Sequence, residues 1–254
     1  MFTSNMKSFK KLRLFLILIV AIGTSYGFYS AKESIDAVDV AADHSKLDAL
    51  LKKHVSSSGK VNYAGFKTDV ASLDAYLKNL SANVPASGAS KNDKLAYWMN
   101  AYNAFTVKLI LNNYPVSSIK KISSDPWKVK FIKLGQKTYD LSTIEHGILR
   151  KMGDARIHVG INCASVSCPK LANKAFTAAN VQSELTRLTK AFIKDKSKNQ
   201  ISANEVKLSK IFDWFKSDFA SKGTLIDWIN KYSDVKINAK AKVSYLTYNW
   251  NLNK

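Results

Sequence analysis

The stretch DKLAYWMNAYNAFTVKLILNNYP, residues 93–115, is the most hydrophobic part of the chain beyond its first thirty residues. Apolar side chains occur nearly all round a helix drawn through it, and a helix of this kind is buried. Asp93 is placed to cap the start of the helix, and Pro115 ends it. The stretch therefore predicts a buried helix in the core of a globular domain.

Two amide side chains lie within this helix. Asn100 and Asn103 are three residues apart and share a helical face with Ala104, Val107 and Leu111. Because an unpaired buried amide costs about 1–3 kcal/mol, each must have hydrogen-bond partners. Two interpretations stay open: the amides brace neighbouring backbone, or they belong to a polar site. Both are therefore candidate site residues.

The other segments show the periodicities of helices or hairpins. Helices are expected at residues 44–55, 66–82, 142–152 and 178–195, with two short ones at 211–219 and 224–232. Hairpins are expected at residues 130–142, turning near Gly135 and Gln136, and at 200–209, and a buried strand at 156–162. Helices outnumber strands without β–α–β alternation. The predicted class is α+β, a predominantly helical single domain with a few short strands and hairpins.

Residues 1–30 have the pattern of a targeting segment. Four basic residues precede the apolar run LFLILIVAIG at residues 14–23, and the small residues TSYG follow. This order is typical of a secretory signal peptide, here with cleavage after Gly27. An uncleaved membrane anchor is the alternative, because residues 12–29 are about long enough to span a bilayer. We expect an exported protein, periplasmic or extracellular, with residues 31–44 as a tether and 45–254 as the domain.

The charge of the chain bears on its partners. The 254 residues are 46% hydrophobic, as in globular rather than disordered proteins. Removing residues 1–27 leaves 35 Lys and Arg against 19 Asp and Glu. So basic a protein is attracted to anionic surfaces. The lysines are dispersed and no nucleic-acid-binding motif is present, so we expect an anionic cell-envelope polymer or lipid headgroups as partners, and no nucleic acid.

The sequence HVGINCASVSCPK, residues 158–170, contains both cysteines of the chain. In an exported protein, a disulfide between Cys163 and Cys168 is the ordinary expectation. It requires a turn, because five residues of helix would separate the Cα atoms by about 7.5 Å. A metal site would need His158 and His146 as further ligands, and C-x4-C is longer than most zinc knuckles, so no metal is expected.

The third interpretation makes Cys163 a nucleophile, which requires a thiolate, a base and a positive local field. If residues 156–162 form a strand, His158 points to the opposite face from Cys163. His146 is then the better base, because it comes from another element. Small residues after Cys163 would leave backbone N–H groups free to lower the pKa of its thiol. The alternatives for Glu145 are a capping box with Ser142 and a functional acid.

Five motifs follow one another along the chain: YWMNAYNAFTVKLI, LSTIEHGILR, DARIHVGINCASVSCPKL, IFDWFKSDF and YNWNLN. In this order they resemble the DUF547 family, a domain of unknown function found in bacterial exported proteins and in some plant and nematode proteins. The resemblance covers about residues 45–254. It implies no activity. Relatives outside bacteria tend to carry serine where Cys168 stands, which weakens an obligatory disulfide.

The chain departs from the family at one position. Bacterial members usually read Y-D-W where this chain has Tyr248, Asn249 and Trp250. An amide at Asn249 could still orient an imidazole, as in Cys-His-Asn sites.

These observations lead to one hypothesis and one alternative. The first is a cysteine-dependent hydrolase or acyltransferase acting on a peptide or small molecule without a cofactor. Its catalytic candidates are Cys163, His146, Glu145, Asn100 and Asn103. Its candidate binding residues are His158, Ser165 and Asn249. The alternative is a non-catalytic binding module of the cell envelope with a structural Cys163–Cys168 disulfide.

Overall fold

The computed structural model describes residues 41–254. The predicted signal or anchor segment, and residues 31–40 of the predicted tether, lie outside the described residues. Of the helices formed by residues 41–254, none is both long and apolar enough to cross a membrane.

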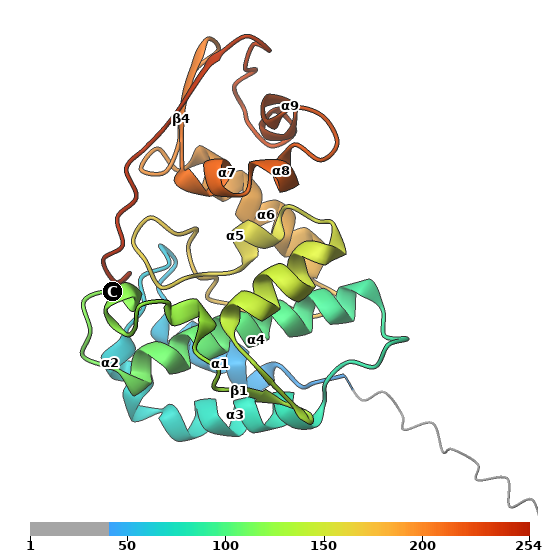
Figure 1. The fold of residues 1–254 in the computed structure, drawn as a ribbon, viewed down its shortest axis with the longest axis vertical. Coiled ribbons are helices and arrows are strands. Elements are labelled where there is room, and N and C mark those ends of the chain that lie inside the picture. The colour runs from blue at the N-terminus through green and yellow to red at the C-terminus, as the bar shows by residue number, and fades with distance from the viewer. Residues whose placement is uncertain (1–40) are drawn as a thin grey trace, which may run out of the picture. The chain divides into compact units, whose positions relative to one another are not determined.

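The central helix is α4 (Lys91–Asn112), which contacts α2, α3, α6 and the helical segment η3 (Figure 1). Sixteen consecutive or nearly consecutive residues of α4 are buried, as the all-round apolar pattern predicts. The predicted cap is wrong by three residues. Ser90 caps the helix by accepting a hydrogen bond from the backbone N–H of Asp93, which lies in the first turn.

Three shorter helices come before α4: α1 (Ser45–His54), α2 (Tyr63–Thr68) and α3 (Val70–Ala82). Helices α2 and α3 pack on α4, and α1 packs on α2 and α3. The sequence predicts a single helix over residues 66–82, but the chain breaks at Asp69. The Asp69 carboxylate lies 2.7 Å from Lys53 Nζ and 2.6 Å from His54 Nε2. These contacts connect the junction between α2 and α3 to the C-terminal end of α1.

The segment after α4 contains two short 3₁₀ turns, η1 (Ile119–Lys121) and η2 (Pro126–Lys128), and then a hairpin. Strands β1 (Ile132–Leu134) and β2 (Lys137–Tyr139) pair antiparallel around Gly135, whose φ is +57°, which confirms the predicted hairpin. The next helix is present but takes a π-helical form, η3 (Thr143–Leu149), continued by η4 (Arg150–Met152). Helices of this form are rare and often mark functional sites.

The strand predicted over residues 156–162 is wrong. Residues 157–160 form one helical turn, α5 (Ile157–Gly160), and the chain becomes extended only at Ile161. A short apolar run cannot be assigned to strand or helix by periodicity alone. A side chain at Gly160 would clash with Met99 and Leu185, so the glycine allows α5 to pack closely on α4 and α6.

The remaining elements follow the predicted order, with one pairing that the sequence pattern did not indicate. Strands β3 and β4 form the predicted hairpin, and β5 then adds to β4 in parallel. These elements are α6 (Val181–Lys194), β3 (Gln200–Ile201), β4 (Glu205–Leu208), α7 (Lys210–Trp214), α8 (Lys216–Phe219), α9 (Leu225–Asn230) and β5 (Lys242–Tyr245). With its many helices and two small sheets, the described chain confirms the α+β class.

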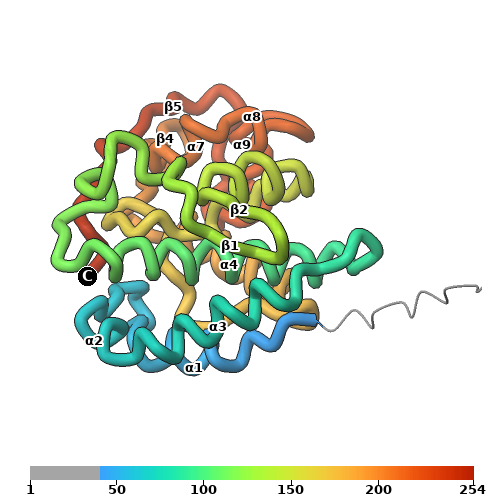
Figure 2. Tube along the Cα trace, turned by 60° about the horizontal axis from the view of Figure 1, so that its bottom comes forward, coloured from blue at the N-terminus to red at the C-terminus, as the bar shows by residue number. Residues whose placement is uncertain are grey.

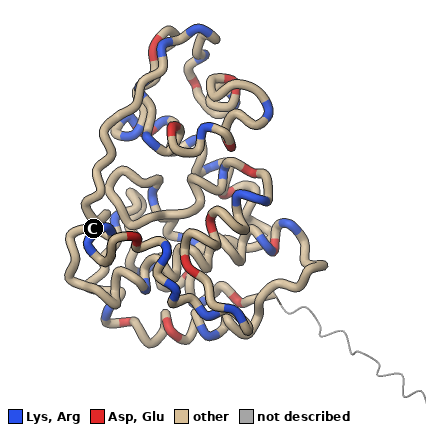
Figure 3. Tube along the Cα trace, in the orientation of Figure 1, with Lys and Arg blue, Asp and Glu red and all other residues tan. Residues whose placement is uncertain are grey.

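Residues 246–253, here called the closing segment, return from β5 to the first half of the domain (Figure 2). They pair with residues 161–170, here called the cysteine loop, through a β-bridge between Ser165 and Leu252. The backbone N–H of Val166 donates to the Asn251 carbonyl at 2.8 Å. Lys and Arg are dispersed over the described elements (Figure 3). The end of the chain thus closes over the segment that carries both cysteines.

Candidate active site

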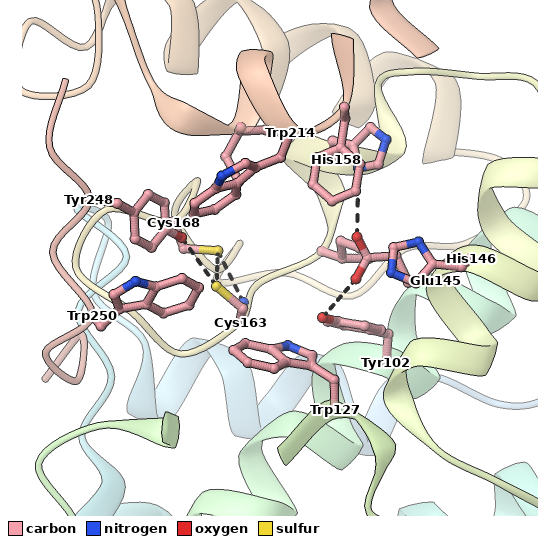
Figure 4. Close-up of a pocket in the computed structure, with 13 residues that line it drawn as sticks. Tyr102, Trp127, Glu145, His146, His158, Cys163, Cys168, Trp214, Tyr248 and Trp250 are labelled. Atoms are coloured by element: carbon pink, nitrogen blue, oxygen red, sulfur yellow. Dashed lines mark hydrogen bonds and ion pairs between the residues drawn. The ribbon is translucent and has the colours of Figure 1, made fainter. Parts of the chain in front are cut away.

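A pocket of about 330 Å³ lies beside the cysteine loop (Figure 4). Its walls come from α4, η2, η3, α5, the cysteine loop, α7 and the closing segment. Its lining residues are Tyr102, Trp127, Glu145, His146, His158, Ile161, Cys163, Cys168, Ile211, Trp214, Phe215, Tyr248 and Trp250. Of the catalytic and binding candidates, four line this pocket: Cys163, Glu145, His146 and His158. Cys168, predicted as a possible disulfide partner, lines it as well.

The cysteine loop makes a turn, as a close approach of its two cysteines requires. Ala164 has a φ of +60°, an uncommon conformation for a residue with a side chain. The Cys163 and Cys168 Sγ atoms lie 3.0 Å apart, and both thiols are free. A disulfide has an S–S distance of about 2.05 Å, so this structure shows a hydrogen-bonded pair of thiols.

The two thiols have different surroundings. Cys168 is 5% exposed, whereas Cys163 is half-buried at the pocket wall. The Cys163 sulfur lies 3.3 Å from the Ser165 hydroxyl and 3.3 Å from the Tyr248 hydroxyl. Hydrogen bonding with the Cys168 thiol lowers the pKa of Cys163, and the hydrogen bonds with Ser165 and Tyr248 lower it further. Burial raises the pKa of Cys168. Cys163 is therefore the more readily ionised thiol.

Asn100 and Asn103 brace backbone rather than line the pocket. Asn100 exchanges two hydrogen bonds with Phe176, donating to its carbonyl at 2.7 Å and accepting from its N–H at 3.0 Å. Asn103 donates to the Gly160 carbonyl and accepts from the Asn162 N–H, both at 2.9 Å. The prediction that both amides have partners is confirmed. Asn103 also fixes the backbone immediately before Cys163.

Glu145 faces the pocket from η3 and is buried. It accepts a hydrogen bond from the Tyr102 hydroxyl at 3.2 Å through Oε2. Burial raises the pKa of Glu145 to about 7, and the nearby Cys163 thiolate adds to this shift. The predicted capping box is wrong, because Ser142 makes no cap and the Thr143 N–H donates instead to Asp140 Oδ1 at 2.6 Å.

His158 is 2% exposed and is held by a carboxylate that the sequence analysis missed. Its Nε2 lies 2.8 Å from Asp218 Oδ2, and its ring stacks on Phe215 with centroids 3.8 Å apart. Arg150 binds both Asp218 oxygens, at 2.6 and 2.8 Å. Arg150 thereby lowers the pKa of Asp218 to about 2, whereas burial lowers the pKa of His158 to about 4. The imidazole is neutral at pH 7.

His146 has a different environment. It is exposed, and its Nδ1 lies 3.2 Å from Arg150 Nη1. Burial of part of the ring and the Arg150 charge lower the pKa of His146. Within residues 41–254, the hydrogen-bond partners of the Cys163 sulfur include neither histidine. A strand over residues 156–162 would have turned His158 away from Cys163. Because residues 157–160 form a helical turn instead, His158 lies with His146 and Cys163 in the pocket wall.

The remaining two binding candidates lie on the cysteine side of the site. Ser165 is buried and donates to the Tyr248 hydroxyl at 2.9 Å. The Asn249 side chain accepts from the Asn251 N–H at 2.9 Å, and its own N–H donates to Ser167. Asn249 therefore braces the closing segment. Orientation of an imidazole is carried out by Asp218 instead.

Four aromatic side chains lie around the two cysteines in the close-up (Figure 4). Trp250 lies between the others, with ring centroids 5.5 Å from Trp127, 5.7 Å from Trp214 and 4.5 Å from Tyr248. None was singled out as a site residue from the sequence, although Trp214, Tyr248 and Trp250 belong to the motifs that carry the family resemblance. In the described residues, no cluster of three or more His, Cys, Asp or Glu side chains is arranged to hold a metal ion.

The family model described as a protein of unknown function, DUF547, matches residues 86–193. This segment is similar to the DUF547 family. The resemblance is thereby confirmed over α4, η3, α5, the cysteine loop and most of α6. Asp218, α7 and the closing segment follow the matched range, so part of the pocket wall and the partner of His158 come from outside it. No curated protein and no solved structure matches the chain.

Proposed function

We propose that this protein is a cysteine-dependent hydrolase or acyltransferase in which Cys163 is the nucleophile. The observation that carries the proposal is the asymmetry of the thiol pair. Cys163 faces a pocket and has a lowered pKa, whereas Cys168 is buried, keeps its proton and can donate it in a hydrogen bond to an ionised Cys163. A thiolate at a pocket wall is the group that attacks an acyl carbon in covalent catalysis.

The surroundings of Cys163 suit the first step of such a reaction. The thiolate sulfur would attack the carbonyl carbon of an ester, thioester or amide, the bond to the leaving group would break, and a thioester would remain on Cys163. The Tyr248 hydroxyl lies 3.3 Å from the sulfur and can donate to oxygen that develops negative charge nearby. Cys168 keeps a proton because of its burial, so it can support the thiolate without competing as a nucleophile.

The wall of the pocket favours a substrate with an apolar or aromatic part. Trp127, Trp214, Tyr248 and Trp250 offer ring faces, and polar side chains are confined mainly to the cysteine side and to the side of Glu145. This arrangement supports a small molecule or a peptide side chain that carries an acyl group. We further propose that the protein acts outside the cytoplasm and meets an anionic envelope polymer or lipid headgroups through its dispersed basic residues.

A specific observation keeps the binding-module alternative in view. Two sulfur atoms 3.0 Å apart need only a small approach and an oxidant to form a disulfide. Oxidation would remove the nucleophile and leave an aromatic pocket that only binds. The catalytic proposal therefore concerns the reduced protein.

Acylation of the reduced full-length chain by p-nitrophenyl acetate tests the proposal. We expect an acetyl group on the peptide that carries Cys163, found by mass spectrometry, and none on that peptide in Cys163→Ala. Cys168→Ala is the matched control, because it removes a thiol 3.0 Å away and keeps the Cys163 sulfur. Acetylation of Cys163 should persist in it, at a lower rate near neutral pH because a hydrogen-bond partner that lowers the Cys163 pKa is gone. Equal, slow acetylation of both cysteines and of surface lysines would contradict the proposal.

A further inference from the structure

One buried nitrogen in the pocket wall plays no part in the proposed acylation of Cys163. His158 Nδ1 is buried and has no hydrogen-bond partner within the described residues. A buried polar atom without a partner is costly and calls for an explanation. Because His158 lines the pocket, the missing partner can be a group on a bound molecule.

The other ring nitrogen determines what Nδ1 can do. Asp218 has the lower pKa of the pair and is a carboxylate, so His158 Nε2 carries the hydrogen and donates to it. In a neutral imidazole the second nitrogen is then an acceptor. Arg150 holds both oxygens of Asp218, which fixes the carboxylate and through it the ring. Nδ1 therefore presents a lone pair.

Glu145 faces the same nitrogen. Its Oε1 lies 3.9 Å from His158 Nδ1, too far for a direct hydrogen bond, whereas Oε2 is held by Tyr102. The dashed lines in the close-up show the two groups facing each other (Figure 4). An oxygen atom bound beside them could donate its hydrogen to Nδ1 and contact the Glu145 carboxyl. A hydroxyl group, which carries a hydrogen to donate, suits this position.

We propose that His158, positioned by Asp218, is the general base that takes the proton from a hydroxyl group, of water or of an alcohol, that attacks the Cys163 thioester. This inference rests on the proposed function and supplies its second half. The hydroxyl oxygen bonds to the thioester carbonyl carbon, and its proton passes to His158 Nδ1. The carbon–sulfur bond then breaks, Cys163 leaves as a thiolate, and an acid or an ester is released.

The assignment differs from the sequence-based one, in which His146 is the base. His146 is exposed, and its Nδ1 faces the Arg150 guanidinium, which presents donors only. His146 is therefore a poor acceptor for a substrate hydroxyl. The matched control is His44→Gln, because His44 does not line this pocket and pairs with Tyr76. Asp218 is a positioning residue, since it touches the imidazole and not the reacting atoms.

The test separates acylation from deacylation in the reduced full-length chain. The probe is p-nitrophenyl acetate, with nitrophenol release recorded as a burst and a steady rate, and with acetyl on Cys163 followed by mass spectrometry. His158→Gln keeps an amide that can donate to Asp218 and removes the ring acceptor. We expect its burst to persist and its deacylation to slow by about 100-fold or more, the usual contribution of a general base. His44→Gln, which changes a histidine outside this pocket, should deacylate as the parent does, whereas a larger loss in His146→Gln than in His158→Gln would overturn the assignment.

A second variant covers the case in which His158→Gln does not fold. Asp218→Asn leaves every ring in place, and its amide can donate to Nε2, which moves the ring hydrogen to Nδ1. We expect slower deacylation with a changed pH profile, a readout that a purely structural role would leave unaltered. Adding methanol distinguishes the two hydroxyl sources: methyl acetate indicates an alcohol acceptor, and acetate alone indicates water.

The outcomes separate the two proposals. A parent that takes up no acetyl on Cys163 contradicts the proposed function, and this inference with it. A parent that is acetylated and deacylates at the same rate as His158→Gln and Asp218→Asn upholds the nucleophile and overturns the assignment of His158.

Discussion

The replacement of Asn100 by leucine is expected to destabilise the protein although it adds apolar volume to the core. Asn100 is 1% exposed, and its amide supplies both hydrogen bonds of the Phe176 peptide groups that face it. Leucine can replace neither bond. The Phe176 carbonyl and N–H would then remain buried without these partners.

The magnitude follows from two opposing effects. Each unpaired backbone group costs about 1–3 kcal/mol, so the two together cost roughly 4 kcal/mol. Burying leucine in place of the amide returns roughly 2 kcal/mol. The expected net loss in the free energy of unfolding is about 2 kcal/mol, which corresponds to a fall of about 4–8 °C in Tm for a chain of this size.

The assay is urea unfolding followed by tryptophan fluorescence, with a thermal melt beside it. Asn112→Leu is the matched control, because Asn112 ends the same helix, is exposed and makes no side-chain hydrogen bond. A surface change of this kind is expected to stay within about 0.5 kcal/mol. An unchanged or higher urea midpoint in Asn100→Leu would refute the claim that the two hydrogen bonds between Asn100 and Phe176 stabilise the fold.

Three further predictions concern the cap of η3, the buried carboxyl and the N-terminal segment. Asp140→Ala should lower the free energy of unfolding by about 0.5–2 kcal/mol in thermal melts, because Asp140 accepts a hydrogen bond from the Thr143 N–H. Ser142→Ala should have little effect. A larger loss in Ser142→Ala than in Asp140→Ala would instead support a capping box between Ser142 and Glu145. Burial raises the pKa of Glu145 to about 7, so the stability that its protonated form contributes is complete below the unfolded pKa near 4.5 and is lost as the pH rises through 7. Urea midpoints measured from pH 4 to 8 should therefore fall less in Glu145→Gln than in the parent. Parallel curves for the two proteins would contradict this prediction. Cell fractionation with N-terminal sequencing should find either a start near Phe28 or a full-length chain in the membrane, and a full-length chain in the soluble cytoplasmic fraction would contradict export.

The sequence predicted the buried structure around the site better than the pairing of the residues that line it. The buried pairs made by Asn100 and Asn103 could be predicted, because a helix that is apolar all round leaves an amide no route to water. The turn between Cys163 and Cys168 could also be predicted from small residues followed by proline. Both predictions depend only on residues that are close together in the sequence.

The residues that the sequence pattern missed depend on long-range contacts. His158 and Asp218 are 60 residues apart, and nothing in the pattern around either one indicates the other. Because residues 156–162 were predicted to form a strand, His158 was expected to point away from Cys163. In the helical turn α5 it lines the pocket instead. Tyr248 reaches Cys163 only because the closing segment pairs with the cysteine loop, a pairing 85 residues apart in sequence.

The most direct test of the central claim is the pH dependence of cysteine alkylation in the reduced protein. Iodoacetamide labelling at each cysteine, quantified by mass spectrometry between mildly acidic and alkaline pH, reports the ionisation of each thiol. We predict that Cys163 is labelled much faster than Cys168 at mildly acidic pH, and that Cys168→Ala moves the Cys163 profile to higher pH because its main hydrogen-bond donor is gone. Equal, slow labelling at both cysteines, with a profile at the ordinary thiol pKa of about 8.5, would contradict the claim that Cys163 is a nucleophile.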